Sequence, residues 1–229
     1  MMTFMLDCKS KNKYLWALIL KIMLSRVREI LDHESDAVRN IPVTENYDHV
    51  IELIHKHVHQ LKGKLVTSGM GKAGQIAHDF ATTFSSTGTP AVFLHPSEAQ
   101  HGDLGVLQEN DLLLVISNSG RTREILELLD LKDNLFPAMP VVVITGNNSS
   151  PLWERATLGL FTGGPAEVCP LGLTPTTSTT VMTVIGDVLV ALMIEKIGFT
   201  ASEYAKRHHG GYLGYKSRER SGSQGGSIY

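Results

Sequence analysis

Cysteine is scarce in this chain of 229 residues, which contains only Cys8 and Cys169. Neither cysteine lies in a C-x-x-C or similar metal-ligand spacing. The sequence therefore gives no sign of a zinc-binding or disulfide-stapled scaffold. We expect two free thiols in a reducing compartment, which favours a cytoplasmic protein.

The chain also lacks a strong charge imbalance and a long uninterrupted apolar run. Its formal net charge is −2, which does not indicate a nucleic-acid partner or a polybasic membrane anchor. The apolar run 14–24 is interrupted by Lys21, is too short to span a bilayer, and precedes no small-residue cleavage site. We expect it to belong to an amphipathic first helix, with no signal peptide and no membrane contact.

Alternating strand and helix patterns fill the middle of the chain, after a helical stretch at residues 12–62. The run Val141–Ile144 is apolar on both faces, as in a central parallel strand. The alternation predicts an α/β fold of three layers, a doubly wound, flavodoxin-like α/β/α arrangement with a five-stranded parallel sheet. Expected strands are 64–68, 91–95, 112–117, 141–145 and 159–162, and expected helices are 73–85, 122–135, 151–156, 178–197 and 200–207.

Three segments follow from this pattern. Residues 1–44 form an N-terminal helical segment, residues 45–214 form one α/β domain, and the polar tail 215–229 is expected to be disordered. Ligands of open parallel sheets bind beyond the carboxyl ends of the strands. The loops that follow the strands should therefore contain the site.

The loop after the first strand reads Gly69-Met70-Gly71-Lys72-Ala73-Gly74 and matches G-x-G-x-x-G. A dinucleotide site would also need an acidic residue about 20 positions further on, where this chain has His95-Pro96. A tight strand-to-helix turn without a ligand would explain the glycines alone. Lys72 and the backbone amides instead favour an anionic substrate.

The loop 117–122 after the third strand collects hydroxyl groups where a helix begins. Ser117, Ser119 and Thr122 surround Asn118 and Gly120. Unpaired amides and the helix dipole attract anions at such a terminus. Helix capping needs only one of these hydroxyls, so we predict phosphate binding.

Two other loops offer titratable groups. His95, Glu98, His101 and Asp103 could approach a divalent ion, but their spacing fits no standard metal site. We therefore expect no metal requirement. The hydroxyl run 174–180 could cap the next helix or bind substrate, and His208 follows the last expected helix beside Gly210-Gly211.

Taken together, these loops resemble the sugar isomerase (SIS) domain family, and within it the D-arabinose 5-phosphate isomerases. The resemblance covers roughly residues 45–214, and its most specific element is the string C-P-L-G-L-x-P-T-x-S-T-T at residues 169–180. It implies a three-layer α/β/α domain, homotetramers with active sites shared between subunits, and exchange of D-arabinose 5-phosphate with D-ribulose 5-phosphate. That reaction leads to the eight-carbon acid Kdo of Gram-negative lipopolysaccharide.

The resemblance also assigns roles to residues. The family's functional lysine falls on Lys72, its glutamates on Glu124 and Glu167, and its histidine on His208. Expected substrate or phosphate ligands are Ser68, Gly71, His101, Ser117, Asn118, Ser119, Thr122, Thr177 and Ser178.

The chain departs from the family pattern in three ways. Ala73 replaces a frequent serine, and His209 replaces a frequent proline. The paired CBS regulatory domains of many members are not expected after residue 214.

Aldose–ketose exchange through a cis-enediol needs an acid–base pair and a positive group near the developing oxyanion, but no cofactor. Glu167 is the favoured C–H base with His208 assisting, and the reverse assignment stays open. A downstream sugar or sugar nucleotide is a candidate feedback inhibitor at the same site. Two other functions also stay open: isomerisation of a hexulose or heptose phosphate, and a non-catalytic sugar-phosphate-binding regulator.

Overall fold

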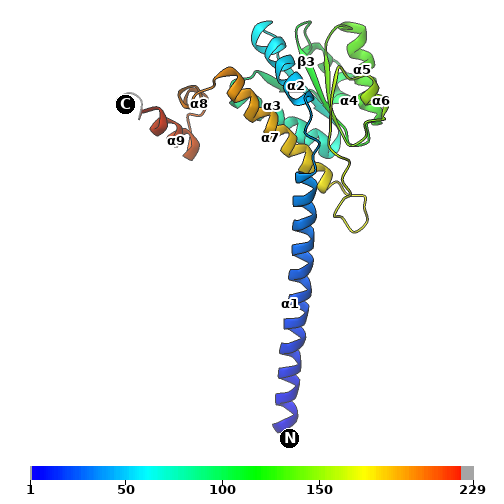
Figure 1. Cartoon of the computed structure of the whole chain (residues 1–229), viewed down its shortest axis with the longest axis vertical. Coiled ribbons are helices and arrows are strands. Elements are labelled where there is room, and N and C mark those ends of the chain that lie inside the picture. Colours follow the sequence, from blue (N-terminus) through cyan, green and yellow to red (C-terminus); the bar gives the residue numbers. More distant parts are fainter. Residues whose placement is uncertain (1, 223–229) are drawn as a thin grey trace.

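The protein is an α/β body with a long helix leaving it on one side and a short helical arm on another (Figure 1). The computed structural model describes the backbone of residues 2–222 and the side chains of residues 16–221. Cys8 therefore lies outside the described side chains, and residues 223–229 lie outside the description altogether.

Five parallel strands form the sheet in the order β2-β1-β3-β4-β5, which is the flavodoxin-like order. Their bounds are β1 Leu65–Gly69, β2 Ala91–Phe93, β3 Leu112–Ile116, β4 Val141–Thr145 and β5 Leu158–Phe161. The predicted three-layer fold is confirmed. The second strand is shorter than expected, because Pro96 begins a helix and His95 occupies its N-cap position.

Helices cover both faces of the sheet. One face packs against α2 (Asn46–Ile54), α3 (Gly71–Ser86) and α7 (Thr177–Ile197), and the other against α4 (Pro96–Ala99), α5 (Arg123–Leu135) and α6 (Pro151–Glu154). Alternate residues of β3 serve opposite faces: Leu114 belongs to the first cluster, whereas Leu113 and Val115 belong to the second. The strands are apolar on both sides because both sides are covered.

The remaining elements lie at the ends of the chain or between the layers. They are α1 (Met2–Arg39), the π-helix η1 (His55–Gln60), the 3₁₀ helix η2 (Asp103–Val106), α8 (Ala201–Arg207) and α9 (Gly211–Gly222). The prediction of disorder from residue 215 is corrected for residues 215–222, which form the last eight of the 12 residues of α9. Gly214 allows α9 to lie against the backbone of His208, where a Cβ would be 2.2 Å from the carbonyl oxygen.

Helix α7 is long and apolar enough to span a membrane, judged by length and composition alone. Half of its most apolar stretch is buried within the protein. Val181, Ile185 and Leu189 pack into the first core cluster and account for that composition. We therefore interpret α7 as a core helix of the α/β body.

Candidate active site

The loop between β1 and α3 places Lys72 at the carboxyl edge of the sheet. Gly69 and Gly74 allow the helix to approach the strand end, since a Cβ on Gly74 would lie 2.5 Å from the Gly69 carbonyl oxygen. Gly71 has a positive φ of 57°, which suits glycine at this sharp turn. Lys72 follows in the first turn of α3 with an exposed side chain.

The loop after β3 is held together by its own hydroxyls. Ser117 Oγ lies 3.0 Å from Thr122 Oγ1 and accepts a hydrogen bond from Gly120 N. Ser119 Oγ accepts from Arg121 N at 3.2 Å. A Cβ on Gly120 would lie 2.0 Å from Ser150 Oγ, so glycine is required here. The loop is thus a preformed turn at the start of α5 rather than an open strand connection.

These two loops meet because β1 and β3 are neighbours, with Gly69 opposite Ile116. Between β1 and β3 lies the point where the strand order reverses, which is the usual ligand site in doubly wound sheets. A cavity of about 280 Å³, which we call the Lys72 cavity, lies there. Six predicted site residues line it: Lys72, Ser117, Asn118, Ser119, Thr122 and Ser178. One ammonium, several hydroxyls and a helix N-terminus are well suited to a phosphorylated ligand.

Six further residues line this cavity without having been predicted as ligands: Met70, Ala73, Ile116, Pro175, Thr179 and Met182. Thr179 belongs to the hydroxyl run 174–180, so that pattern could have identified it. The two methionines left no signal in the sequence beyond their apolar character.

Glu167 lies behind the cavity wall and contacts it through Ser178. Ser178 Oγ donates to Glu167 Oε1, while Thr176 N and Thr176 Oγ1 donate to Oε2 at 2.7 and 2.8 Å. Ser178 N adds a longer bond of 3.3 Å. Burial disfavours the charged form, but the hydrogen bonds from Ser178 and Thr176 outweigh it and lower the pKa of the Glu167 carboxyl. The side chain is therefore ionised at neutral pH.

The other predicted residues are not brought to this cavity within one chain. Ser68 and Thr177 are buried, and their hydroxyls donate to Leu94 O and Glu34 Oε1. Glu124 is half-buried in the first turn of α5, and His101 is exposed after α4. As substrate ligands or catalytic groups these residues, and Gly71, stay predictions.

His208 lies on the C-terminal arm, beyond α8. Its ring stacks on Tyr204 with 3.7 Å between centroids, and its Nδ1 donates to the Tyr204 carbonyl 3.0 Å away. Because Nδ1 carries that proton in the neutral ring, Nε2 is left as an acceptor. The residue does not line the Lys72 cavity of its own chain.

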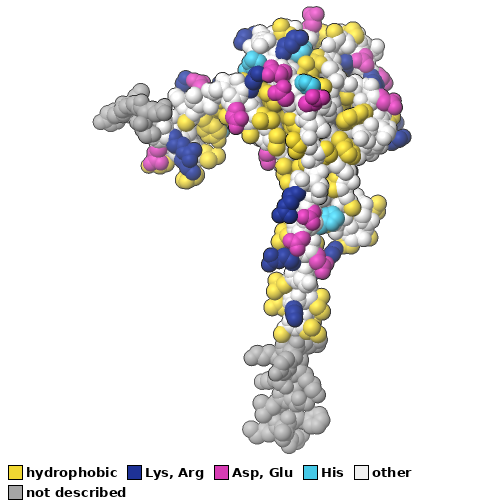
Figure 2. Space-filling model, in the orientation of Figure 1, with side chains coloured by type: hydrophobic (Ala, Val, Ile, Leu, Met, Phe, Trp, Pro, Cys, Tyr) yellow, Lys and Arg dark blue, Asp and Glu magenta, His cyan; other side chains and the backbone are white. Residues whose placement is uncertain are grey.

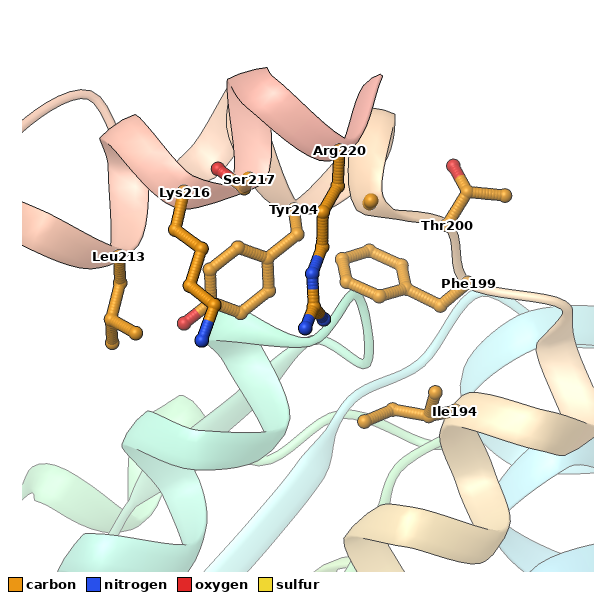
Figure 3. A pocket seen from close by; sticks show the side chains of 9 residues that line it. Ile194, Phe199, Thr200, Tyr204, Leu213, Lys216, Ser217 and Arg220 are labelled. Atoms are coloured by element: carbon orange, nitrogen blue, oxygen red, sulfur yellow. The ribbon is translucent and has the colours of Figure 1, made fainter. Parts of the chain in front are cut away.

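A second cavity, of about 340 Å³, separates the arm from the end of α7 (Figure 3). Phe199, Tyr204 and Leu213 contribute apolar walls, and Lys216 and Arg220 point toward the same space. It contains none of the predicted site residues. We place the chemistry in the Lys72 cavity, because that cavity lies at the switch point of the sheet and combines a cation with a helix N-terminus.

Metal binding and thiol chemistry would need side chains other than those that line the Lys72 cavity. Among the described residues, no group of three or more His, Cys, Asp or Glu side chains is placed to hold a metal ion. Cys169 is a free thiol. Hydrogen bonds from the Thr174 hydroxyl and from backbone N–H groups of Thr174, Leu171 and Leu173 lower the pKa of Cys169 to about 7.

The sheet order and the cavity at its switch point define a doubly wound α/β domain with a candidate anion site, and sequence comparison identifies the family. The model of the SIS domain matches residues 59–192, and the chain belongs to this family.

The chain is also similar to individual proteins. It is 46% identical over 153 residues to arabinose 5-phosphate isomerase KdsD of Pseudomonas aeruginosa, which covers 67% of this chain and 46% of that protein. The chain thus spans about half the length of the curated relatives it matches.

Two solved structures match this chain over nearly their whole length. A putative phosphosugar isomerase involved in capsule formation, from Bacteroides fragilis, is 64% identical with a TM-score of 0.82, covering 83% of this chain and 99% of that one. A protein of Escherichia coli CFT073 in complex with arabinose 5-phosphate is 32% identical with a TM-score of 0.75, covering 82% and 98%.

Proposed function

We propose that the chain interconverts D-arabinose 5-phosphate and D-ribulose 5-phosphate. The main supporting observation is the cavity at the ends of β1 and β3, where Lys72 and the hydroxyls of the 117–122 loop share one space of about 280 Å³. The similarity to arabinose 5-phosphate isomerases supports the choice of substrate. The substrate phosphate would occupy the 117–122 loop, and its C1–C2 end would lie toward Lys72.

The reaction moves one proton between C2 and C1 and leaves the carbon skeleton unchanged. A base removes the C2 proton of the open-chain aldose, and the electron pair forms the C1–C2 double bond of an enediolate. Lys72 stabilises the negative oxygen that develops. Protonation at C1 and transfer of the hydroxyl proton then give the ketose.

The acid–base groups are the carboxylates and the histidine. Glu167 is the proposed C–H base, because its carboxylate contacts Ser178 of the cavity lining and is ionised at neutral pH. His208, with Nε2 as an acceptor, would assist ring opening or shuttle a hydroxyl proton, and Glu124 is the second acid–base candidate. No step requires a cofactor or a metal, because the substrate is its own oxidant and reductant.

The assembly that goes with this function is a cytoplasmic homotetramer in which His208 reaches the cavity of a neighbouring chain. Its product would enter synthesis of Kdo for lipopolysaccharide. A downstream anionic sugar or sugar nucleotide would inhibit by competing at the cavity mouth.

The test is an isomerase assay with D-ribulose 5-phosphate, run with and without EDTA, beside a panel of hexulose and heptose phosphates. We expect the highest kcat/KM with the pentose phosphate pair, no loss in EDTA, and deuterium incorporation from D₂O. Faster turnover of a longer sugar phosphate would assign the chain to another SIS isomerase. Tight binding of sugar phosphates without turnover would favour a regulator.

A further inference from the structure

The long helix α1 contacts the Glu167 loop through two consecutive residues, His33 and Glu34. His33 Nε2 lies 2.9 Å from the Ala166 carbonyl oxygen, and because a carbonyl can only accept, Nε2 donates. Glu34 Oε1 accepts a hydrogen bond of 2.9 Å from Thr177 Oγ1. These partners are 133 and 143 residues apart in the sequence, so both are tertiary contacts.

Thr177 transmits the second contact to the other side of Glu167. Its Oγ1 also accepts from Val168 N at 3.2 Å, and its side chain is fully buried. Helix α1 therefore holds the backbone directly before Glu167, at Ala166, and directly after it, at Val168. Thr176 and Ser178, which donate to the Glu167 carboxylate, are the two chain neighbours of Thr177.

Glu34 by itself is expected to contribute little to the stability of the fold. Its Oε2 is buried and has no hydrogen-bond partner among the described side chains and backbone. A carboxylate with one oxygen unpaired and buried is unfavourable for folding. Its placement is better explained by the hydroxyl that its other oxygen holds.

We propose that Glu34 is a positioning residue that fixes the Glu167 carboxylate through Thr177. This rests on the proposed isomerase function, in which Glu167 acts on the substrate. Glu34 lies outside residues 59–192, the part of the chain that matches the family model. The N-terminal helix thus contributes to the geometry of the site without touching the substrate.

Replacing Glu34 with Ala removes the acceptor of a buried hydroxyl, so Thr177 must turn away and release Val168 N. A small displacement of a reacting group has a large effect on rate. We expect kcat to fall by about 10- to 100-fold. KM should change by less than about twofold, because the phosphate loop lies on other elements.

Conservative variants separate positioning from general stability. Glu34→Gln keeps an acceptor oxygen at the same place, and Thr177→Ser keeps the hydroxyl. Both should lose much less kcat than Glu34→Ala, whereas Thr177→Val should resemble Glu34→Ala. Asp32→Ala is the matched control, since Asp32 is an exposed carboxylate on the same helix. The Glu34→Ala/Thr177→Val double variant should lose little more than either single variant, because both break one connection.

Amide hydrogen exchange of residues 166–178 gives a readout that does not depend on activity. Exchange should be faster in Glu34→Ala than in wild type or Glu34→Gln. If Glu34→Ala does not fold, Thr177→Val compared with Thr177→Ser decides by the same two measurements. Wild-type kcat in the disruptive variants, equal defects in the conservative ones, or unchanged exchange would overturn the inference. An inactive wild-type protein with the expected exchange pattern would instead refute the proposed function alone.

Discussion

The α/β body and the two segments that leave it differ in how far a single chain covers its apolar side chains. In the body, both faces of the sheet are covered, and residues such as Leu114 and Val143 are fully buried. On α1, apolar side chains between residues 16 and 31 are exposed, with Trp16 at 67% and Ile22 at 61% (Figure 2). The arm exposes Tyr212 and Tyr215 in the same way.

This difference separates the cavity, which one chain forms alone, from the apolar surfaces of α1 and the arm, which one chain leaves uncovered. The body forms the cavity lined by Lys72 by itself. A helix that is apolar on several sides is normally buried between other helices. Because His208 lies on the arm and not at its own cavity, the proposed acid–base set would be complete only if segments of neighbouring chains come together.

The strongest test of the site in the α/β body is removal of the Lys72 ammonium or of the Glu167 carboxylate. Lys72→Ala and Glu167→Gln should each lower kcat by at least about 100-fold without unfolding the protein, since each removes a group that acts in the transition state. Steady-state kinetics with circular dichroism would measure both effects. Lys56→Ala, at an exposed lysine on η1, should behave as wild type. Near-normal turnover in either variant would remove that residue from the mechanism.

Subunit mixing tests whether the arm serves a neighbouring body. His208→Ala should be nearly inactive, because the acid–base shuttle is lost. Mixing it with inactive Lys72→Ala should restore partial activity, since some mixed sites receive both residues intact. Activity after confirmed subunit exchange is the measurement. No recovery, or full activity in a monomer, would contradict the shared site.

A charge in the exposed stretch of α1 tests whether that helix is an interface. Leu20→Asp, at a side chain that is 55% exposed in one chain, should reduce the solution mass below that of a tetramer. Light scattering after size exclusion would measure it. The neighbouring change Lys21→Glu reverses a charge without removing an apolar group and serves as control. Unchanged mass in Leu20→Asp would show that α1 is not an assembly surface.

The smallest expected effect belongs to the phosphate loop. Ser119→Ala should raise KM about tenfold and change kcat by less than about twofold, because a hydrogen bond to a charged phosphate acts equally in the ground and transition states. Ser149→Ala, in the exposed loop after β4, is the matched control. A defect confined to kcat would assign the loop another role.

Most of the body could be predicted from sequence, because its signals are local. The run Val141–Ile144 is apolar on both faces and became β4, and glycine at positions 69, 74 and 120 marked loops that are too tight for a Cβ. The loops after β1 and β3 could be placed together because parallel strands all end at one edge.

The parts that could not be predicted depend on tertiary contacts. Helix α9 has no apolar stripe, and it packs on α8 through the close approach of Gly214 to His208. The donors of Glu167 lie 9 and 11 residues later, at the N-cap and in the first turn of α7. Glu34 contacts Thr177, at the start of α7, from a helix 143 residues earlier in the chain, which no local pattern reveals.

The contact between Gly120 and Ser150 has a consequence for how this site can change over evolutionary time. Ser150 accepts from Trp153 N at the start of α6, and a side chain at position 120 would displace it from that cap. Asn118 approaches Gly146 as closely, since a Cβ there would lie 2.2 Å from Asn118 Oδ1. A side chain at position 146 is therefore tolerated only together with a change at position 118, whereas Gly120, with a φ of 61°, disfavours any substitution. Among related chains, position 118 should vary in concert with position 146, while glycine should be retained at position 120.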